Sequence, residues 1–297
     1  MFKKIYCICA AMLASSACIY ADSHINTKNW QEVLTSVENT TQIPEQTLIL
    51  FDVNDVLIAP TDIILSKYHR QEAIDKIKKI HKIEQNEAQP GVHPVLREDL
   101  EVTKTFMDIW TKTHIDVVDQ DGPQAIQALQ EKGYNVMGLT NGITGSIGGI
   151  TNMVGYRSDE LYRLGYTFKG PNGLGKIPLG TAVAVGNGAP IYQDGIIYTA
   201  GQAKGPVLDT FLQKSHIKPN KIILVDDKKG NLDSVATFCR KHGIDFVGIE
   251  FNALAGQQKY VSYDKKIGAC QFEHYQKYHQ WLSDQDIAKT ACFRKSV

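Results

Sequence analysis

The sequence has no excess of charge of either sign. Its 32 Lys and Arg residues equal its 32 Asp and Glu residues, and no run of like charges dominates. Proteins that bind nucleic acid or an anionic membrane surface usually carry a basic patch or a basic run. No nucleic-acid partner is therefore expected.

Cysteines are few, and none has the spacing of a zinc ligand. Three of the six lie in the first 21 residues, and the rest of the chain holds Cys239, Cys270 and Cys292. No Cys-x-x-Cys pair or Cys/His group is present, which disfavours a structural zinc site. An odd number of cysteines cannot form a closed disulfide framework. The best candidate for one bridge is Cys270 with Cys292, although spacing alone does not establish it.

The N-terminus carries the features of a secretory signal peptide. Lys3 and Lys4 precede an apolar run from Ile5, and a small residue, Ala21, precedes polar sequence. Residues 1–21 are therefore expected to be removed on export. An uncleaved anchor is less favoured because the run is short and rich in Ala and Ser, and "SSAC" around Cys18 is a poor lipoprotein site. An exported protein, periplasmic or secreted, with no stable membrane anchor after cleavage is expected.

Short apolar strands alternate with helical patterns along the chain. "TLILFD", "NVMGLT", "KIILV" and "FVGIEF" have the length and composition of buried strands, and helical segments lie between them. This alternation predicts an α/β fold, a doubly wound parallel sheet. Isoleucines at every third position from Ile74, then a second helical stretch to Trp110, predict a mainly helical cap at residues 62–118. The core is expected at 22–61 and 119–297, with a Gly-rich flap at about 142–201.

Polar residues stand at the carboxyl ends of three expected strands, which is where open α/β sheets bind ligands. A lysine also opens the helix that leads into the third strand. These residues are Asp52 and Asn54 after "LILF", Thr140 and Asn141 after "VMGL", Asp226 and Asp227 after "IILV", and Lys204. Three acids facing one crevice would repel one another unless a cation lies there, which favours a functional role over helix capping.

These motifs resemble those of the haloacid dehalogenase-like hydrolase superfamily. Its members carry an acidic DxDx(T/V) motif after the first strand, a Ser or Thr after the second, a Lys, and a late acidic pair. "FDVNDVL", "GLTNG", "GQAKG" and "ILVDDKKGN" follow this order over most of the mature chain. They look most like a group of secreted bacterial members of undefined function, the DUF2608-like proteins.

The resemblance implies a Mg²⁺-dependent phosphatase that acts through an aspartyl-phosphate. Its substrate would be a small phosphorylated molecule or a phosphorylated host or surface molecule; the sequence identifies neither the substrate nor the oligomeric state. The implied catalytic residues are Asp52, Asn54 and Lys204. The implied phosphate-binding residues are Thr140, Asn141 and Lys204, and the implied metal site comprises Asp52, Asn54, Asp226 and Asp227.

Asn54 departs from the superfamily pattern. The residue at this position normally gives its backbone carbonyl to the metal and its carboxyl group as general acid and base. An amide cannot perform the second task, which is typically worth about 10²–10⁴-fold in rate. Asp55 does not obviously replace it, because neighbouring residues after a strand point in different directions. Three outcomes stay open: a hydrolase for good leaving groups, a slow phosphatase, or a catalytically degenerate protein that binds metal or phosphate.

Overall fold

The centre of the protein is a mostly parallel eight-stranded sheet. The computed structural model describes residues 22–40, 43–82, 100–170, 173–182 and 188–294. The strand order is β1-β10-β9-β2-β5-β8-β7-β6, and neighbours from β1 to β8 are parallel. The strands are β1 (Asp22–Thr27), β2 (Thr47–Phe51), β5 (Asn135–Thr140), β6 (Ile177–Pro178), β7 (Ile191–Gln193), β8 (Ile196–Tyr198), β9 (Lys221–Asp226) and β10 (Asp245–Phe251).

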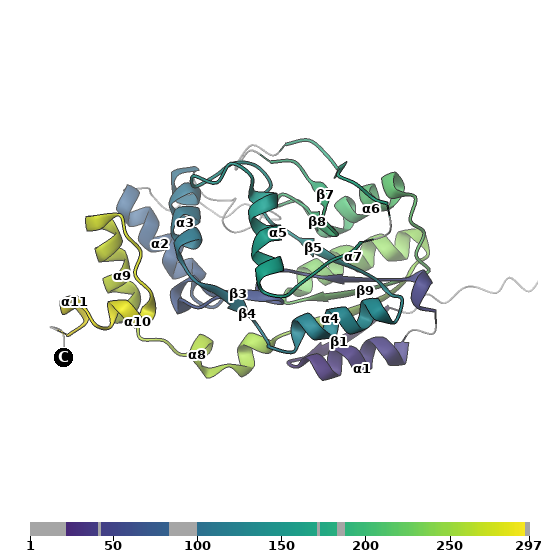
Figure 1. Ribbon diagram of the computed structural model, residues 1–297, viewed down its shortest axis with the longest axis horizontal. Helices are drawn as coiled ribbons and strands as arrows, with labels where there is room; N and C mark the ends of the chain where they lie inside the picture. The colour runs from purple at the N-terminus through teal and green to yellow at the C-terminus, as the bar shows by residue number, and fades with distance from the viewer. Residues whose placement is uncertain (1–21, 41–42, 83–99, 171–172, 183–187, 295–297) are drawn as a thin grey trace, which may run out of the picture.

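Helices cover both faces of this sheet (Figure 1), so the predicted doubly wound α/β fold is confirmed. The covering helices are α1 (Trp30–Thr40) and α4 (Gly122–Glu131) on one face, and α6 (Lys204–Ser215) and α7 (Lys229–His242) on the other. The pleat sends alternate side chains of β2 to opposite faces. Ile49 and Phe51 join the core on the α1 side, and Leu48 and Leu50 join the core on the α7 side. A central parallel strand therefore reads as a continuous apolar run.

An insertion leaves the core after β2 and returns before α4. It begins with β3 (Ile58–Pro60) and ends with β4 (Ile115–Val117), which pair in antiparallel fashion. Between them lie α2 (Arg70–His81) and α3 (Leu100–Lys112), preceded by a short 3-10 turn. The isoleucine pattern and the helical stretch to Trp110 thus correspond to α2 and α3, while Ile83 lies outside the described residues.

The C-terminal helices pack on this insertion, which differs from the expected division at residues 119–297. They are α8 (Gln258–Val261), α9 (Lys265–Tyr278), α10 (Asp284–Ile287) and α11 (Ala291–Arg294). Figure 1 shows α9 beside α2 and α3, away from the sheet. Tyr275 Oη donates to Asp108 Oδ2 at 2.7 Å. A disulfide joins Cys270 to Cys292, as expected, and ties α11 to α9.

Two further regions differ from expectation. The Gly-rich segment 142–201 is not simply a flap: it contains α5 (Met153–Arg163), and its strand β8 pairs in parallel with β5 as part of the main sheet. Only β6 and β7 extend the sheet in antiparallel fashion. Strand β1, which starts at Asp22, was also not expected. It lies at the sheet edge beside β10, where one neighbour suffices and a long apolar run is not needed.

A buried carboxylate ties the insertion to the C-terminal segment. Asp62 Oδ2 accepts hydrogen bonds from Trp281 Nε1 at 2.8 Å and from the hydroxyl of Thr113, and Asp62 Oδ1 accepts from the Asp284 backbone N–H at 2.9 Å. In return, Asp284 Oδ2 accepts from the Ile63 backbone N–H at 3.1 Å. Burial, together with the nearby Asp62, raises the pKa of Asp284 to about 6.

We expect this contact to weaken as pH rises. A carboxyl group whose pKa is raised on folding favours the folded state most at low pH, and this contribution is lost as pH rises through about 6. Asp284→Asn imitates the protonated acid, so the variant should lack this loss. Melting temperatures measured from pH 4.5 to 7.5 report this loss. As pH rises, the wild-type protein should lose stability relative to Asp284→Asn. Parallel curves would contradict the assignment, and the exposed Asp286→Asn is the control.

Candidate functional site

Three buried carboxylates meet at the carboxyl ends of two neighbouring strands. Asp52 follows β2, Asp226 ends β9, and Asp227 comes next. Because β2 and β9 are parallel partners, with Phe51 beside Val225, their ends reach the same edge of the sheet. One oxygen from each acid lies within 4.8 Å of the others. The structure thus brings together the acids that the sequence singled out.

Lys204 neutralises part of this charge. It is the first residue of α6 and is fully buried. Its Nζ lies 2.9 Å from Asp52 Oδ1 and 2.5 Å from Asp226 Oδ2. Burial opposes its charge, but the adjoining carboxylates outweigh burial and raise the pKa of Lys204. Burial also raises the pKa of Asp226 to about 7, with Lys204 acting in the opposite direction.

Asn231, which the sequence reasoning did not single out, fixes the orientation of Asp226. Its Nδ2 donates to both carboxylate oxygens of Asp226, at 2.9 and 3.0 Å. The Lys228 backbone N–H adds a third bond at 2.9 Å. The motif "ILVDDKKGN" already contained the information needed to predict this contact. Asn231 follows Asp226 by five residues, so it lies in the first turn of the next helix and its amide can contact the Asp226 carboxylate.

Asp227 keeps one oxygen without a protein partner. Its Oδ2 accepts from Lys67 Nζ at 3.2 Å, and Lys67 also donates to Asn252 Oδ1 at 3.4 Å. Its Oδ1 is buried and accepts no hydrogen bond from any described residue. A buried acceptor of this kind is costly unless a ligand satisfies it. The carboxylate cluster therefore fits a hard divalent cation, which prefers oxygen ligands.

Thr140 and Asn141 lie at the end of β5, the other neighbour of β2. Thr140 is buried, and its carbonyl accepts from the Thr199 backbone N–H at 2.8 Å. Asn141 Oδ1 accepts from the hydroxyl of Thr199 at 2.9 Å. This contact fixes the Asn141 side chain and leaves its amide N–H groups available. All three strand ends named by the sequence therefore face one region.

Asn54 and Asp55 have different environments. The side-chain oxygen of Asn54 is buried and has no partner among the described residues. Asp55, with a φ of 68°, turns its carboxylate toward Arg70, whose Nη2 lies 3.2 and 3.1 Å from its two oxygens. Burial raises the pKa of Asp55, and Arg70 opposes the rise. Because Arg70 holds the Asp55 carboxylate, Asp55 is not a free acid that could replace the one missing at Asn54.

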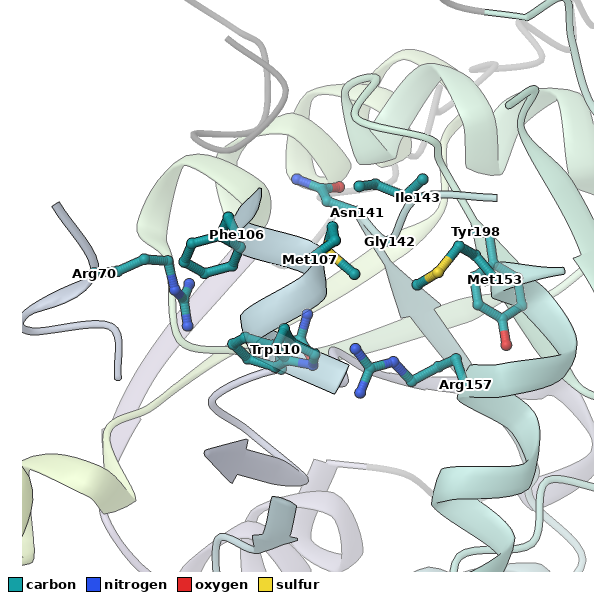
Figure 2. A pocket seen from close by; sticks show the side chains of 11 residues that line it. Arg70, Phe106, Met107, Trp110, Asn141, Gly142, Ile143, Met153, Arg157 and Tyr198 are labelled. Carbon is teal, nitrogen blue, oxygen red and sulfur yellow. The ribbon is translucent and has the colours of Figure 1, made fainter. Parts of the chain in front are cut away.

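A pocket opens beside Asn54 and Asn141. Its cavity volume is about 50 Å³, within a wider hollow of about 550 Å³ that includes open solvent. Figure 2 shows that its walls come from the insertion helices, the loop after β5, and α5. The two guanidinium groups of Arg70 and Arg157 stand on either side of Trp110 in this view. None of these three residues was expected at the site, because no short motif surrounds them.

The fold and the strand-end residues together define an α/β protein with a buried acidic cluster at the carboxyl edge of its parallel strands. The chain belongs to the family described as "Protein of unknown function (DUF2608)", whose model matches residues 26–288.

Some individual proteins also resemble this chain in sequence or in structure. An uncharacterized protein of Rickettsia prowazekii (strain Madrid E) is 25% identical over 248 residues, which span 83% of this chain and 84% of that protein. A Chlamydia pneumoniae protein whose name describes an outer membrane protein is 38% identical over 63 residues, 21% of this chain and 24% of its own length. A haloacid dehalogenase-like hydrolase from Streptococcus pneumoniae matches with a TM-score of 0.37 and 15% identity, over 71% of this chain and 90% of its own. Among the described residues, no helix combines the length and apolarity needed to cross a membrane.

Lys204 is expected to hold the site together. Lys204→Met leaves the buried Asp52 and Asp226 without their shared cation, and losing one partner of a buried ion pair costs about 3–5 kcal/mol. Urea unfolding at pH 8 in EDTA measures this loss. The loss should shrink at pH 5, because burial raises the pKa of Asp226 to about 7 and its protonated carboxyl group no longer needs a cation. Lys229→Met, which removes an exposed lysine on α7, is the matched control and should change little; equal stability of both variants would refute the expectation.

Proposed function

We propose that this protein is a Mg²⁺-dependent phosphatase that transfers a phosphoryl group to Asp52. The observation that supports this most strongly is the position of Asp52. It lies at the end of the central strand and close to a pocket, and Lys204 contacts both Asp52 and Asp226. A nucleophile, a fixed cation and a cation-binding acid cluster are what phosphoryl transfer requires.

Asp52 uses its two oxygens differently in this mechanism. Lys204 engages Oδ1, and Oδ2 accepts no hydrogen bond from the described residues. In the first step, Oδ2 bonds to phosphorus while the bond between phosphorus and the ester oxygen breaks. In the second step, water attacks the phosphorus and releases phosphate, which restores the Asp52 carboxylate.

The remaining motif residues bind the phosphate and the metal. Lys204, the Thr140 hydroxyl and the backbone N–H of Asn141 offset charge on the phosphoryl oxygens. Asp52, Asp226, Asp227 and the Asn54 backbone carbonyl hold Mg²⁺. The metal, when bound, supplies positive charge that offsets the carboxylates and the phosphoryl oxygens.

Asn54 limits this reaction. The departing ester oxygen needs a proton unless its alcohol is acidic, and an amide cannot supply one at neutral pH. Esters of acidic alcohols are therefore the favoured substrates. The same residue supports a second candidate function: a protein that keeps the metal and phosphate site but no longer hydrolyses its ligand.

The proposal includes export from the cytoplasm. It is supported by the basic, apolar and small-residue pattern at the N-terminus. Residues 1–21 lie outside the described part of the chain. Export would place the phosphatase among extracytoplasmic phosphate esters.

Mg²⁺ should bind at the carboxylate cluster. Isothermal titration calorimetry at pH 7.5 should show one site in the wild-type protein, weakened at least about tenfold in Asp227→Asn, which removes a charged ligand. Lys67→Gln should tighten binding by a few-fold, because Lys67 competes with the cation for Asp227. Asp233→Asn, an exposed acid on α7, is the control. Absence of heat with millimolar Mg²⁺ would contradict the metal assignment.

Activity should depend on the leaving group. With Mg²⁺, the wild-type protein should cleave 4-nitrophenyl phosphate at least about 10²-fold faster than an alkyl phosphate, because only the alkyl ester needs proton donation. Asp52→Asn should abolish cleavage, since the nucleophile is lost. Asn54→Asp should raise turnover of the alkyl ester by about 10-fold or more.

The two candidate functions give different outcomes in this assay. If neither ester is cleaved and Asn54→Asp stays inactive, the protein is a binding protein rather than an enzyme. If only Asn54→Asp is active, the phosphate site is intact and catalysis was lost at this one position. A calorimetric titration of the wild-type protein with vanadate then tests directly whether the phosphate site is intact.

A further inference from the structure

The pocket lies where the alcohol part of a phosphate ester would project. Asn54, two residues after Asp52, and Asn141, directly after Thr140, both line it. A phosphoryl group attacked by Asp52 has its departing oxygen on the side away from the nucleophile, which is the in-line arrangement. This inference rests on the proposed function, since it assigns the pocket to the group that leaves.

The walls of the pocket suit a flat apolar group. Phe106, Met107 and Trp110 come from one side of α3, and Met153 and Tyr198 close the opposite side (Figure 2). Aromatic rings offer flat surfaces, and methionine side chains adapt to the outline of a ligand.

Hydrogen-bond donors in this pocket outnumber the acceptors that face them. Arg70 uses Nε on the Leu65 carbonyl and Nη2 on Asp55, and Arg157 uses Nη1 on Glu160. The remaining guanidinium N–H groups have no acceptor among the described residues.

Trp110 adds a further donor. Its Nε1 is buried and has no partner among the described residues, although the side chain is only 4% exposed. The Arg70 and Arg157 guanidinium carbons lie 5.7 and 5.9 Å from the centre of the Trp110 ring. Both arginines are more than nine-tenths buried. The indole N–H and the two guanidinium groups therefore lie around the same aromatic ring.

An acidic group on the ligand would satisfy these donors. The planar guanidinium fork matches the spacing of carboxylate and phosphate oxygens. Asp55 and Glu160 balance the charge of the two arginines, so the pocket selects through its hydrogen-bond donors rather than through excess charge. We propose that this pocket binds the leaving group of the substrate and selects a flat apolar body that carries a second acidic substituent, a carboxylate or phosphate.

Paired substrates test this proposal. The kcat/KM value for 4-carboxyphenyl phosphate should exceed that for 4-(hydroxymethyl)phenyl phosphate at least about tenfold, as expected when a site holds donors for a specific substituent. The kcat/KM value for phenylene bisphosphate, measured in the same series, shows whether a second phosphate can replace the carboxylate. An equal kcat/KM for all three substrates would overturn the proposal, and the arginines would then serve only to pack against Trp110.

Variants identify the donors. Arg157→Gln combined with Glu160→Gln removes the guanidinium without leaving a buried unpaired charge. In this double variant, the preference for 4-carboxyphenyl phosphate over 4-(hydroxymethyl)phenyl phosphate should fall below about threefold. Trp110→Phe keeps an aromatic ring but removes the pyrrole part of the indole together with its N–H, so the preference should fall by about two- to tenfold. Arg163→Gln, on the exposed side of the same helix α5, is the control and should keep the full preference. A preference that survives in both pocket variants would overturn the assignment.

Binding without hydrolysis separates this proposal from the phosphatase proposal. Calorimetry with 4-hydroxybenzoate and 4-hydroxybenzyl alcohol needs no catalysis. Tighter binding of the benzoate in the wild-type protein, lost in the Arg157→Gln, Glu160→Gln variant, supports the pocket even if no ester is cleaved. Ester cleavage with no preference and no benzoate binding would refute the pocket assignment while leaving the phosphatase proposal intact.

Discussion

The mutual repulsion of three buried carboxylates is the constraint on which the site depends. Asp52, Asp226 and Asp227 meet because two parallel strands end side by side, and this arrangement needs positive charge to exist. Lys204 supplies one charge from the start of α6, and Lys67 supplies another from the insertion. One oxygen of Asp227 still lacks a described partner. The fold thus creates an electrostatic requirement that a divalent cation would meet in the proposed function, and such a cation would also attract a phosphoryl group to a site built of acids.

The sequence predicted the parts of the fold whose signals are local. Fully buried strands such as β2 appear as apolar runs, and the polar residues just after them must lie at the same sheet edge. It did not predict β1, because an edge strand with the sequence "DSHINT" has no such run. Helix α5 was hidden by the glycines around it. The C-terminal helices were assigned to the core by their place in the chain, whereas burial of Tyr275 and Trp281 against the insertion decides where they pack.

The candidate site also contains some residues that the sequence predicted and others that it did not. Motif residues were found because strand ends fix their position within a few residues. Arg70, Trp110 and Arg157 come from three helices that are distant in the sequence, and each reads locally as an ordinary helical residue. Only packing of α2, α3 and α5 over the strand ends brings them together. The residues proposed to bind the metal and the phosphate are therefore accessible to sequence reasoning here, and the residues proposed to choose the substrate are not.

Two ion pairs connect these halves of the site, and both start from one short segment at the beginning of the insertion. Lys67 reaches Asp227, and Arg70 reaches Asp55. The second pair bears directly on Asn54. A carboxylate at position 54 would add a negative charge within two residues of Asp52 and next to Asp55 in the chain, whereas an amide adds none. Asn54 therefore lowers the electrostatic cost of the buried acids at the expense of proton transfer. In the proposed reaction, the loss of proton transfer at Asn54 slows only those substrates whose leaving group needs a proton. The choice of substrate in the pocket would therefore decide how much activity Asn54 removes.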